Sequence, residues 1–142
     1  MDLEYGPQYE NFRGEVRAWL ATVWPPQAAE AALPRAEQQK AFLRRAIERG
    51  YLYRRIPKRY GGSERPLELL EETIIAEEFD AAGAPWHLIS QGIGMIVPTL
   101  LEVGADWQRE KFIPPTLLGE IVWCQGYSEP GAGSDLASLR ST

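Results

Sequence analysis

The sequence is poor in the residues that build disulfides, metal sites and membrane spans. Its 142 residues include one cysteine, Cys124, and one histidine, His87. A lone cysteine cannot close an internal disulfide, and neither residue has a neighbour with which to form a zinc site or a Ser-His-Asp triad. No apolar run approaches the ~20 residues that a membrane helix requires. These absences predict a chain with no internal disulfide, no metal site and no membrane span.

Positive charge is outnumbered by negative charge. The chain has 15 Lys and Arg against 20 Asp and Glu, which gives a formal net charge of -5. Its basic residues lie in short groups such as Arg44-Arg45 and Arg54-Arg55, and this pattern argues against nucleic acid as a partner. Residues 1–5 are acidic and lack the basic and apolar regions of a signal peptide, so we predict a cytoplasmic protein.

What the sequence does contain is helical periodicity. Hydrophobic residues make up 44% of the chain and charged residues 25%, which is ordinary for a globular unit with a single core. Pro25 and Pro26 are expected to end a first helix, Gly50 a second, and Pro114 with Pro115 a fifth. A connector is predicted at residues 27–33 and a partly packed loop at residues 51–65. The predicted helices cover about residues 12–23, 35–49, 66–80, 88–103 and 106–112.

The fourth predicted helix contains two glycines and a proline. Gly92 and Gly94 each cost roughly 1 kcal/mol in a helix interior relative to alanine. We therefore expect a neighbour or a ligand to approach the backbone there, and tight helix packing is the simpler of these explanations. Pro98 is expected to kink the helix, because it lacks an N–H and clashes with the preceding turn.

The third predicted helix has one acidic and one apolar side. We interpret the acidic side as a solvated face, and no residue in it is predicted to be catalytic: Glu68, Glu71, Glu72, Glu77, Glu78 and Asp80. The apolar sides of all the helices predict one core: Phe12, Val16, Trp19, Leu20, Phe42, Leu43, Ile47, Leu70, Ile74, Ile93, Ile96, Val97 and Leu100.

A short apolar stretch at residues 121–127 leads into a turn rich in glycine. Its β-branched and aromatic residues predict a strand, in which Cys124 is expected to be a buried thiol, and Pro130 with Gly131 ends that strand. Small residues in the turn let backbone N–H groups approach an anion, and serine hydroxyls lie on either side. The residues alone leave two interpretations open, a phosphate cradle and an ordinary surface turn.

The predicted strand implies a division of the chain. A lone strand after a helical bundle has no partner for its backbone N–H and C=O groups. We therefore predict a helical domain over residues 1–120 and the incomplete start of a β-domain over residues 121–142. On this prediction the sequence stops within a domain.

The turn and two earlier stretches resemble a known protein family. Residues 128–135 read Ser-Glu-Pro-Gly-Ala-Gly-Ser-Asp, and residues 114–120 read Pro-Pro-Thr-Leu-Leu-Gly-Glu. Together they resemble the flavin-binding signature of the acyl-CoA dehydrogenase family. Residues 56–62, Ile-Pro-Lys-Arg-Tyr-Gly-Gly, and residues 92–101, ahead of Gly104 and Gln108, are similar to the same family.

The resemblance implies a fold, a cofactor and a site. The implied fold is mainly α, with an N-terminal bundle of about five helices followed by the first strand of a truncated β-domain. The implied cofactor is flavin adenine dinucleotide (FAD), with Ser128 facing its isoalloxazine ring and Ser134 also contacting acyl-CoA. The residues implied to bind the cofactor are Gln125, Gly126, Tyr127, Ser128, Glu129, Pro130, Gly131, Ala132, Gly133 and Ser134.

The family's reaction introduces a 2,3-double bond into an acyl-CoA thioester, a step of fatty acid metabolism. A glutamate base removes the α-proton while the β-hydride passes to the flavin. In the family that glutamate comes from a C-terminal bundle, which has no counterpart here, so no catalytic residue is assigned and residues 1–142 alone are expected to be inactive. The resemblance also implies an electron-transfer partner protein and a homo- or hetero-oligomer.

Other functions stay open at this point. An acyl-CoA oxidase-like relative would carry the same signature and use oxygen as its electron acceptor. A non-catalytic subunit or interaction module would instead pair with a complete dehydrogenase chain. A bare helical bundle whose turn binds no ligand is the simplest alternative.

Overall fold

The computed structural model describes residues 5–88 and 90–140. These residues are mainly helical and contain no β-strand, which confirms the predicted mainly α class. The α-helices are α1 (Pro7–Val23), α2 (Ala28–Ala31), α3 (Arg35–Arg49), α4 (Leu69–Ala81), α5 (Val97–Val103) and α6 (Asp106–Leu117). Three shorter elements are the 3-10 turn η1 (Lys58–Tyr60), the π-helical turn η2 (Gly92–Ile96) and the 3-10 turn η3 (Leu136–Ser138).

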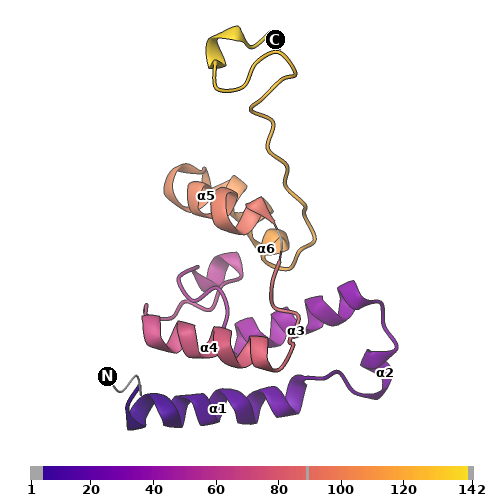
Figure 1. The fold of residues 1–142 in the computed structure, drawn as a ribbon, viewed down its shortest axis with the longest axis vertical. Helices are drawn as coiled ribbons and strands as arrows, with labels where there is room; N and C mark the ends of the chain where they lie inside the picture. Colours follow the sequence, from indigo (N-terminus) through magenta and orange to yellow (C-terminus); the bar gives the residue numbers. More distant parts are fainter. Residues whose placement is uncertain (1–4, 89, 141–142) are drawn as a thin grey trace.

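The helices form two packed groups, and the end of the chain extends away from both (Figure 1). In the first group α1 packs against α4, and α3 contributes to the same core. In the second group α5 packs against α6, and η1 joins this group through its contact with α6. Residues 121–140 leave the end of α6 and reach the far end of the molecule from α1.

Aromatic rings fill the space between α1, α3 and α4. Phe79 of α4 stacks on Trp19 of α1 with ring centroids 5.8 Å apart, and it meets Phe42 of α3 edge-on at 5.2 Å. Such pairs contribute about 0.5–1.5 kcal/mol beyond the area that they bury. Every residue of the predicted core is buried or half-buried, and those fully buried are Val16, Leu20, Phe42, Leu43, Ile74 and Val97.

The loop at residues 51–65 is packed, as predicted, and it joins the two groups. Tyr51 and Leu52 belong to the core of the first group, whereas Ile56 and Tyr60 belong to that of the second. The Ser63 hydroxyl fixes the loop because it donates to the carbonyls of Ile47 (2.8 Å) and Leu52 (2.5 Å). The loop therefore sets how the second group sits on the first.

Helix α3 has the predicted bounds, and its ends show why. Pro34 precedes it in an extended conformation, and its φ of −54° suits a helix start. Gly50 follows it with φ 95°, a left-handed conformation that favours glycine. The Gly50 N–H then donates to carbonyls of the last turn, which would otherwise lack a partner.

Helix α6 continues through two prolines, so the prediction that Pro114 and Pro115 end it is wrong. Their missing N–H groups leave the carbonyls of Glu110 and Lys111 without helical partners. Both of those residues are exposed, so water can satisfy these carbonyls. The free energy that keeps this segment helical comes from the other side of the helix, where Ile113, Thr116 and Leu117 are buried.

Three further bounds differ from the predictions. The residues predicted as a fourth helix form the π-helical turn η2 and then α5, and Pro98 lies in the first turn of α5, where its missing N–H costs little. Helix α4 begins at Leu69 rather than Pro66, because Glu68 is still extended. Part of the predicted connector forms α2, as the high helix propensity of alanine allows.

Residues 121–127 do not form the predicted strand. Figure 1 shows them as an extended stretch, and their backbone N–H and C=O groups make no backbone hydrogen bond to another described segment. A strand exists only where a neighbour accepts and donates its backbone hydrogen bonds, and the helical groups offer none. The pattern of residues is that of a strand, whereas the partner that would make it one is absent from the described residues.

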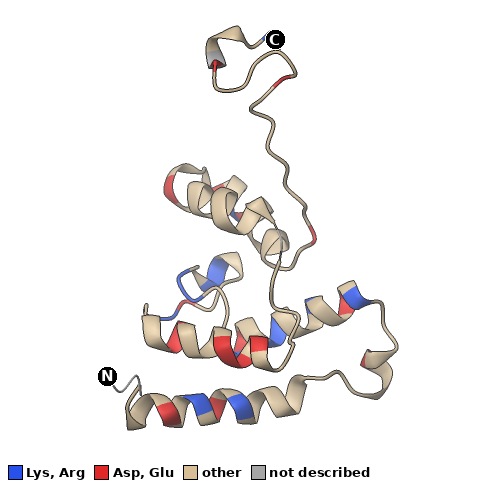
Figure 2. Ribbon diagram, viewed as in Figure 1, with Lys and Arg blue, Asp and Glu red and all other residues tan. Residues whose placement is uncertain are grey.

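One carboxylate on the acidic side of α4 is buried against α1. Glu78 is only 6% exposed. It accepts hydrogen bonds from Arg13 (2.7 Å) and from Arg17 Nε (2.6 Å), and Arg13 also donates to Glu77 (2.8 Å). The prediction of a solvated face is therefore wrong for Glu78, and Figure 2 shows basic positions of α1 beside acidic positions of α4.

Two opposing effects act on the protonation of Glu78. Burial favours the neutral form, but the hydrogen bonds from Arg17 and Arg13 outweigh it and lower the pKa of Glu78 below its ordinary value of 4.5. Because the folded-state pKa is lowered, the ion pairs stabilise the fold above the ordinary pKa. That stabilisation is lost as the pH falls through the folded-state pKa.

We predict that Glu78→Ala destabilises the chain by roughly 3 kcal/mol at neutral pH, the lower end of the range for breaking a buried ion pair, because Arg13 keeps Glu77 as a partner. Urea unfolding followed by circular dichroism measures this difference. The difference should shrink as the pH falls below about 4.5. The exposed Glu110→Ala serves as the control, and equal midpoints for both variants would contradict the prediction.

Candidate functional site

The segment that carries the glycine-rich turn is anchored to the second helical group mainly by one tryptophan, and the Gln91 side chain adds a hydrogen bond to Gln125 (3.4 Å). The indole N–H of Trp123 donates to the Thr116 hydroxyl of α6 (2.9 Å). Its ring meets Phe112 edge-on, with centroids 5.7 Å apart. It also lies against Gly92 of η2, where a Cβ atom would be 2.5 Å from Trp123 Cδ1. The predicted close approach at Gly92 is thus confirmed, and the neighbour is a side chain of this chain.

The turn itself is held by hydrogen bonds within residues 129–140. Glu129 and Ala132 exchange backbone hydrogen bonds of 2.8 and 3.1 Å, which closes a tight turn around Pro130 and Gly131. The Glu129 carboxylate accepts the backbone N–H of Arg140 (3.0 Å). The turn is therefore a defined structure rather than a free tail, even without a partner strand.

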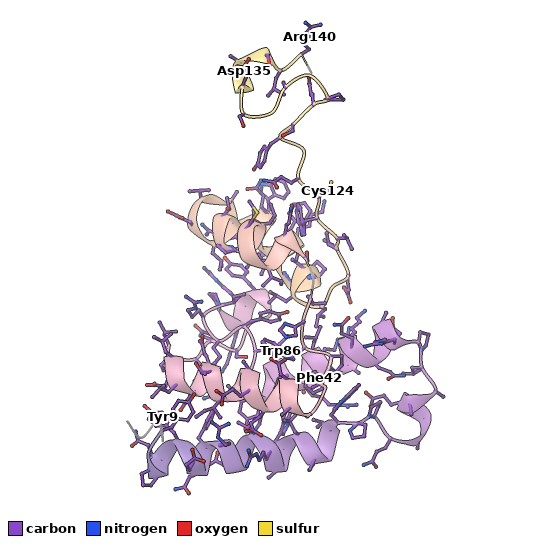
Figure 3. The ribbon with its side chains drawn as sticks, in the orientation of Figure 1. Tyr9, Phe42, Trp86, Cys124, Asp135 and Arg140 are labelled. Atoms are coloured by element: carbon purple, nitrogen blue, oxygen red, sulfur yellow. The ribbon has the colours of Figure 1, made fainter. Side chains whose placement is uncertain are left out.

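The turn stands clear of the helices. Figure 3 shows Asp135 and Arg140 at one end of the molecule, with Cys124 between them and the helical groups. All the residues predicted to bind the cofactor lie in this one segment, as their adjacency requires. Most of them are exposed, Glu129 is half-buried and Ala132 is buried: Gln125, Gly126, Tyr127, Ser128, Glu129, Pro130, Gly131, Ala132, Gly133 and Ser134.

The exposure of this segment corrects one prediction. Cys124 is exposed rather than a buried thiol. Val122 and Tyr127 are 85% and 64% exposed. Large apolar side chains on both sides of an extended segment are typical of a strand covered on both faces, and no described residue covers this one. The sequence pattern therefore describes an environment that the described chain alone does not provide.

The two glycines of the turn are not required by the packing of this chain. A Cβ atom added at Gly131 or Gly133 would meet no atom within 4 Å, and neither residue has a left-handed backbone. Their backbone N–H groups make no backbone hydrogen bond among the described residues. Bare glycines with available N–H groups fit the close approach of an anionic group such as the pyrophosphate of FAD.

A second concave feature lies between the two helical groups. It is a cavity of about 600 Å³, bordered by the loop at residues 51–56, by α4, by residues 86–88 and by η2 and α5. Its walls are mostly aliphatic and aromatic, and the charged residues that border it in the described chain include Glu72, Arg54 and Arg55. The loop has no period in its sequence, so Tyr53 and Glu72 were not predicted to share a site. The dense aromatic content of residues 51–53 was the feature of the sequence that could have indicated this cavity.

An aspartate fixes the rim of this cavity. Asp80 accepts a hydrogen bond from the Trp86 indole N–H (2.8 Å), and His87 Nε2 lies 3.1 Å from the same oxygen. The hydrogen bond from Trp86 lowers the pKa of Asp80, burial opposes this effect, and the hydrogen bond and charge of His87 lower the pKa further. His87 also packs on the Trp86 ring, with centroids 3.9 Å apart.

Two kinds of site are not found in the part of the chain that the structure describes. Within residues 5–88 and 90–140 no group of three or more acidic, histidine or cysteine side chains is placed to hold a metal ion. None of the described helices has the length and apolar character needed to cross a membrane.

Comparison with known proteins identifies the family. The sequence model of a protein family, the acyl-CoA dehydrogenase N-terminal domain, matches residues 6–120. The chain belongs to the acyl-CoA dehydrogenase family. This confirms the resemblance that the sequence motifs carry, and the match covers both helical groups.

Individual relatives agree with the family and show how much of them the chain spans. It is 36% identical to the acyl-CoA dehydrogenase FadE26 of Mycobacterium tuberculosis over 149 residues, which cover 100% of this chain and 36% of that protein. It is 40% identical to FadE34 of the same organism over 131 residues, which cover 92% of this chain and 16% of that protein. The chain thus spans about a third or less of these relatives.

Solved structures of the family resemble the whole chain. The ChsE4-ChsE5 complex from Mycobacterium tuberculosis matches with a TM-score of 0.60 and 35% identity, over 100% of this chain and 36% of that one. The structure of the Tcur3481-Tcur3483 steroid ACAD matches with a TM-score of 0.57 and 30% identity, over 98% of this chain and 36% of that one. Each of these structures is named for two different chains.

We predict that Gly92→Ala destabilises the chain by about 1–3 kcal/mol, the usual cost of overpacking, because the new Cβ meets Trp123 and Thr116. Gly94→Ala is the matched control, since a Cβ there meets nothing within 4 Å. It should be neutral or stabilising by up to about 1 kcal/mol. Thermal unfolding of both variants tests this, and equal losses at the two positions would contradict the proposed anchor.

Proposed function

We propose that this chain is the N-terminal part of a flavin-dependent acyl-CoA dehydrogenase, an oxidoreductase that introduces a 2,3-double bond into an acyl-CoA thioester. On this proposal residues 1–120 form the family's helical domain, and residues 121–142 begin its β-domain. The observation that carries the proposal is similarity to acyl-CoA dehydrogenases along the entire chain. A cytoplasmic location and an electron-transfer partner protein belong to the same proposal.

The turn at residues 125–134 is the proposed FAD site. Its support is the signature together with the open glycines, whose N–H groups suit a pyrophosphate. The Ser128 hydroxyl would lie at the isoalloxazine ring, and Ser134 would contact acyl-CoA. When bound, the flavin supplies the hydride acceptor. The chain's own contribution is to hold the cofactor and to present the hydroxyls of Ser128 and Ser134 on either side of the glycines.

The carboxylate base is proposed to come from outside the described residues. Glu77 and Glu78 are paired with arginines of α1, and the Glu129 carboxylate accepts the N–H of Arg140. Glu72 lines the cavity among the helices, whereas the turn stands clear of them. No described carboxylate therefore combines freedom from partners with a position in a cleft beside the turn.

A second candidate function is favoured by the assemblies of the matched structures. Both structures are named for two different chains, and one of them is named a steroid ACAD. On this alternative the chain is a subunit of a hetero-oligomer that contributes part of a shared cleft, with a bulky ring system as the acyl group.

An acyl-CoA oxidase-like reaction differs only in the electron acceptor, and oxygen consumption with acyl-CoA would reveal it.

The cradle is tested by valine substitutions in the longer protein that this proposal implies. Gly131→Val and Gly133→Val should weaken FAD binding, because a β-branched side chain blocks approach to phosphate. Both side chains begin in open space, so the variants should fold normally. Ser134→Ala should weaken acyl-CoA binding more than FAD binding. FAD titration of each apo variant measures this, and unchanged FAD affinity in both valine variants would refute the cradle.

Residues 1–142 alone are predicted to bind FAD weakly and to show no dehydrogenase activity. The turn offers groups on one side of the cofactor only, and ordering each residue of the unpaired stretch at residues 121–127 costs roughly 1–2 kcal/mol. The test is acyl-CoA-dependent reduction of an artificial electron acceptor, with the longer protein as the positive control. Turnover at a comparable rate would mean that a base lies within this chain, and Glu72 would be mutated before the paired Glu77 and Glu78.

A further inference from the structure

A separate hollow lies at the C-terminal end of α3. It encloses about 480 Å³ and is bordered by α1, the last residue of α3, the start of α4 and residues 65–68. It shares Tyr51 and Arg54 with the cavity between the helical groups and is otherwise lined by different residues. Its volume lies within the ~300–1,000 Å³ of small-molecule sites. Phe12, Pro66 and Leu67 give it apolar surface, and Leu67 is 53% exposed.

Three arginines and three glutamates border this hollow, and only some of them have partners. Arg54 pairs with Glu71 (2.5 Å), and Glu68 accepts a hydrogen bond from the Tyr9 hydroxyl (3.3 Å). Within residues 5–88 and 90–140 the remaining charged side chains at the hollow form no ion pair: Arg49, Arg65 and Glu15. Two guanidinium groups at the hollow therefore lack a carboxylate partner.

The Arg65 side chain is held against the backbone of Gly50. A Cβ atom added at Gly50 would lie 2.7 Å from Arg65 Nε and 3.2 Å from its Nη2. The guanidinium thus occupies the space that a larger residue would need. The backbone N–H of Arg65 donates to the Arg54 carbonyl (2.6 Å), which fixes the point from which the side chain extends. Packing and not a carboxylate therefore places this guanidinium.

Arg49 brings a second guanidinium to the same wall. Its Cζ lies 5.6 Å from the centroid of the Tyr51 ring, which is a cation–π contact. Gly50 and Tyr51 are consecutive residues, so the supports of the two guanidinium groups are adjacent in the chain. Two more donors at this wall, the Tyr51 hydroxyl and Arg54 Nε, are buried and have no partner in the described part of the chain. The wall is thus rich in donors that lack acceptors.

We propose that this hollow binds an organic anion, a carboxylate or a phosphate joined to an apolar group, and that Arg65 donates to the anion. A planar guanidinium presents parallel N–H groups that match two oxygens of either anion. On this proposal the apolar group packs on Phe12 and Leu67. Arg49 adds positive charge, whereas Glu15 repels the ligand as a like charge. The site depends neither on the flavin nor on the activity proposed for the chain.

The experiment compares four small probes. Phenyl phosphate and benzoate carry an anion and a ring, benzyl alcohol carries the ring without the charge, and inorganic phosphate carries the charge without the ring. Each is titrated into the full chain labelled with nitrogen-15, and NMR follows the amide signals of Gly50 and Tyr51 and the Nε–H signal of Arg65.

The ring-bearing anions should bind more tightly than either partial probe. The better of the two should exceed benzyl alcohol by about tenfold, the effect of a hydrogen bond to a charged group. Phenyl phosphate should also bind more tightly than inorganic phosphate, because the ring gains contact with the apolar surface of the hollow. The comparison of phenyl phosphate with benzoate shows which anion the site prefers.

Substitutions distinguish this site from general attraction of anions to arginine. Arg65→Gln should weaken the ring-bearing anions by about tenfold and leave benzyl alcohol unchanged. Glu15→Gln should strengthen them, because it removes a like charge. Arg35→Gln is the matched control, since Arg35 is exposed, forms no ion pair in the described chain and does not border the hollow. Circular dichroism confirms that each variant is folded.

Several results would overturn the proposal. One is the absence of saturable shifts at Gly50 and Tyr51 with both ring-bearing anions. Another is equal affinity of Arg65→Gln and the wild type, which would place the anion elsewhere. A loss in Arg35→Gln as large as that in Arg65→Gln would mean that the probes bind any exposed arginine. Binding of benzyl alcohol as tight as that of the anions would refute the role of charge.

Discussion

The packing of the first helical group depends on the register of α1 on α4, and one buried carboxylate contacts both helices at a single turn. Arg13 and Arg17 are spaced by one helical turn, and both reach Glu78, so a single turn of α1 faces a single turn of α4. The desolvation of such a pair offsets much of its attraction, and the aromatic cluster of Trp19, Phe42 and Phe79 supplies most of the gain from burial. The ion pairs instead determine which turns of α1 and α4 face each other. They hold the aromatic residues of the two helices opposite each other.

The helical part of the fold was predictable because its signals are local. Helix α3 is bounded by Pro34 and Gly50, each of which acts through its own backbone. The predictions fail where a distant contact decides. Pro114 and Pro115 remain in α6 because Ile113 and Leu117 are buried, and Glu78 is buried because α1 brings two arginines to it. Neither contact can be read from the residues adjacent in sequence, since tertiary packing overrides local preference.

The two candidate sites, the turn and the cavity, differ in the same way, because local sequence predicts one and only the fold assembles the other. The residues of the turn are contiguous, so the sequence motif by itself places them together. Tyr53 and Glu72 come from a loop without a period and from a helix face interpreted as solvated. Only the fold brings them to one cavity. The predicted strand at residues 121–127 shows the converse, because Val122 and Tyr127 have the residue types of a covered strand while the described chain leaves them exposed. A strand is a property of two segments, and its sequence specifies one of them.

At one glycine the packing of this chain explains why there is no side chain, whereas at two others it does not. At Gly92 the chain itself explains the absence of a side chain, because Trp123 and Thr116 occupy the space that a Cβ would take. At Gly131 and Gly133 it does not, since a Cβ would meet nothing and the backbone is not left-handed. Glycine lowers stability relative to alanine where the fold makes no use of it. A pair of such residues in an ordered turn fits the proposal that a ligand approaches from outside the described residues, and the pyrophosphate of the proposed flavin is a group that fits.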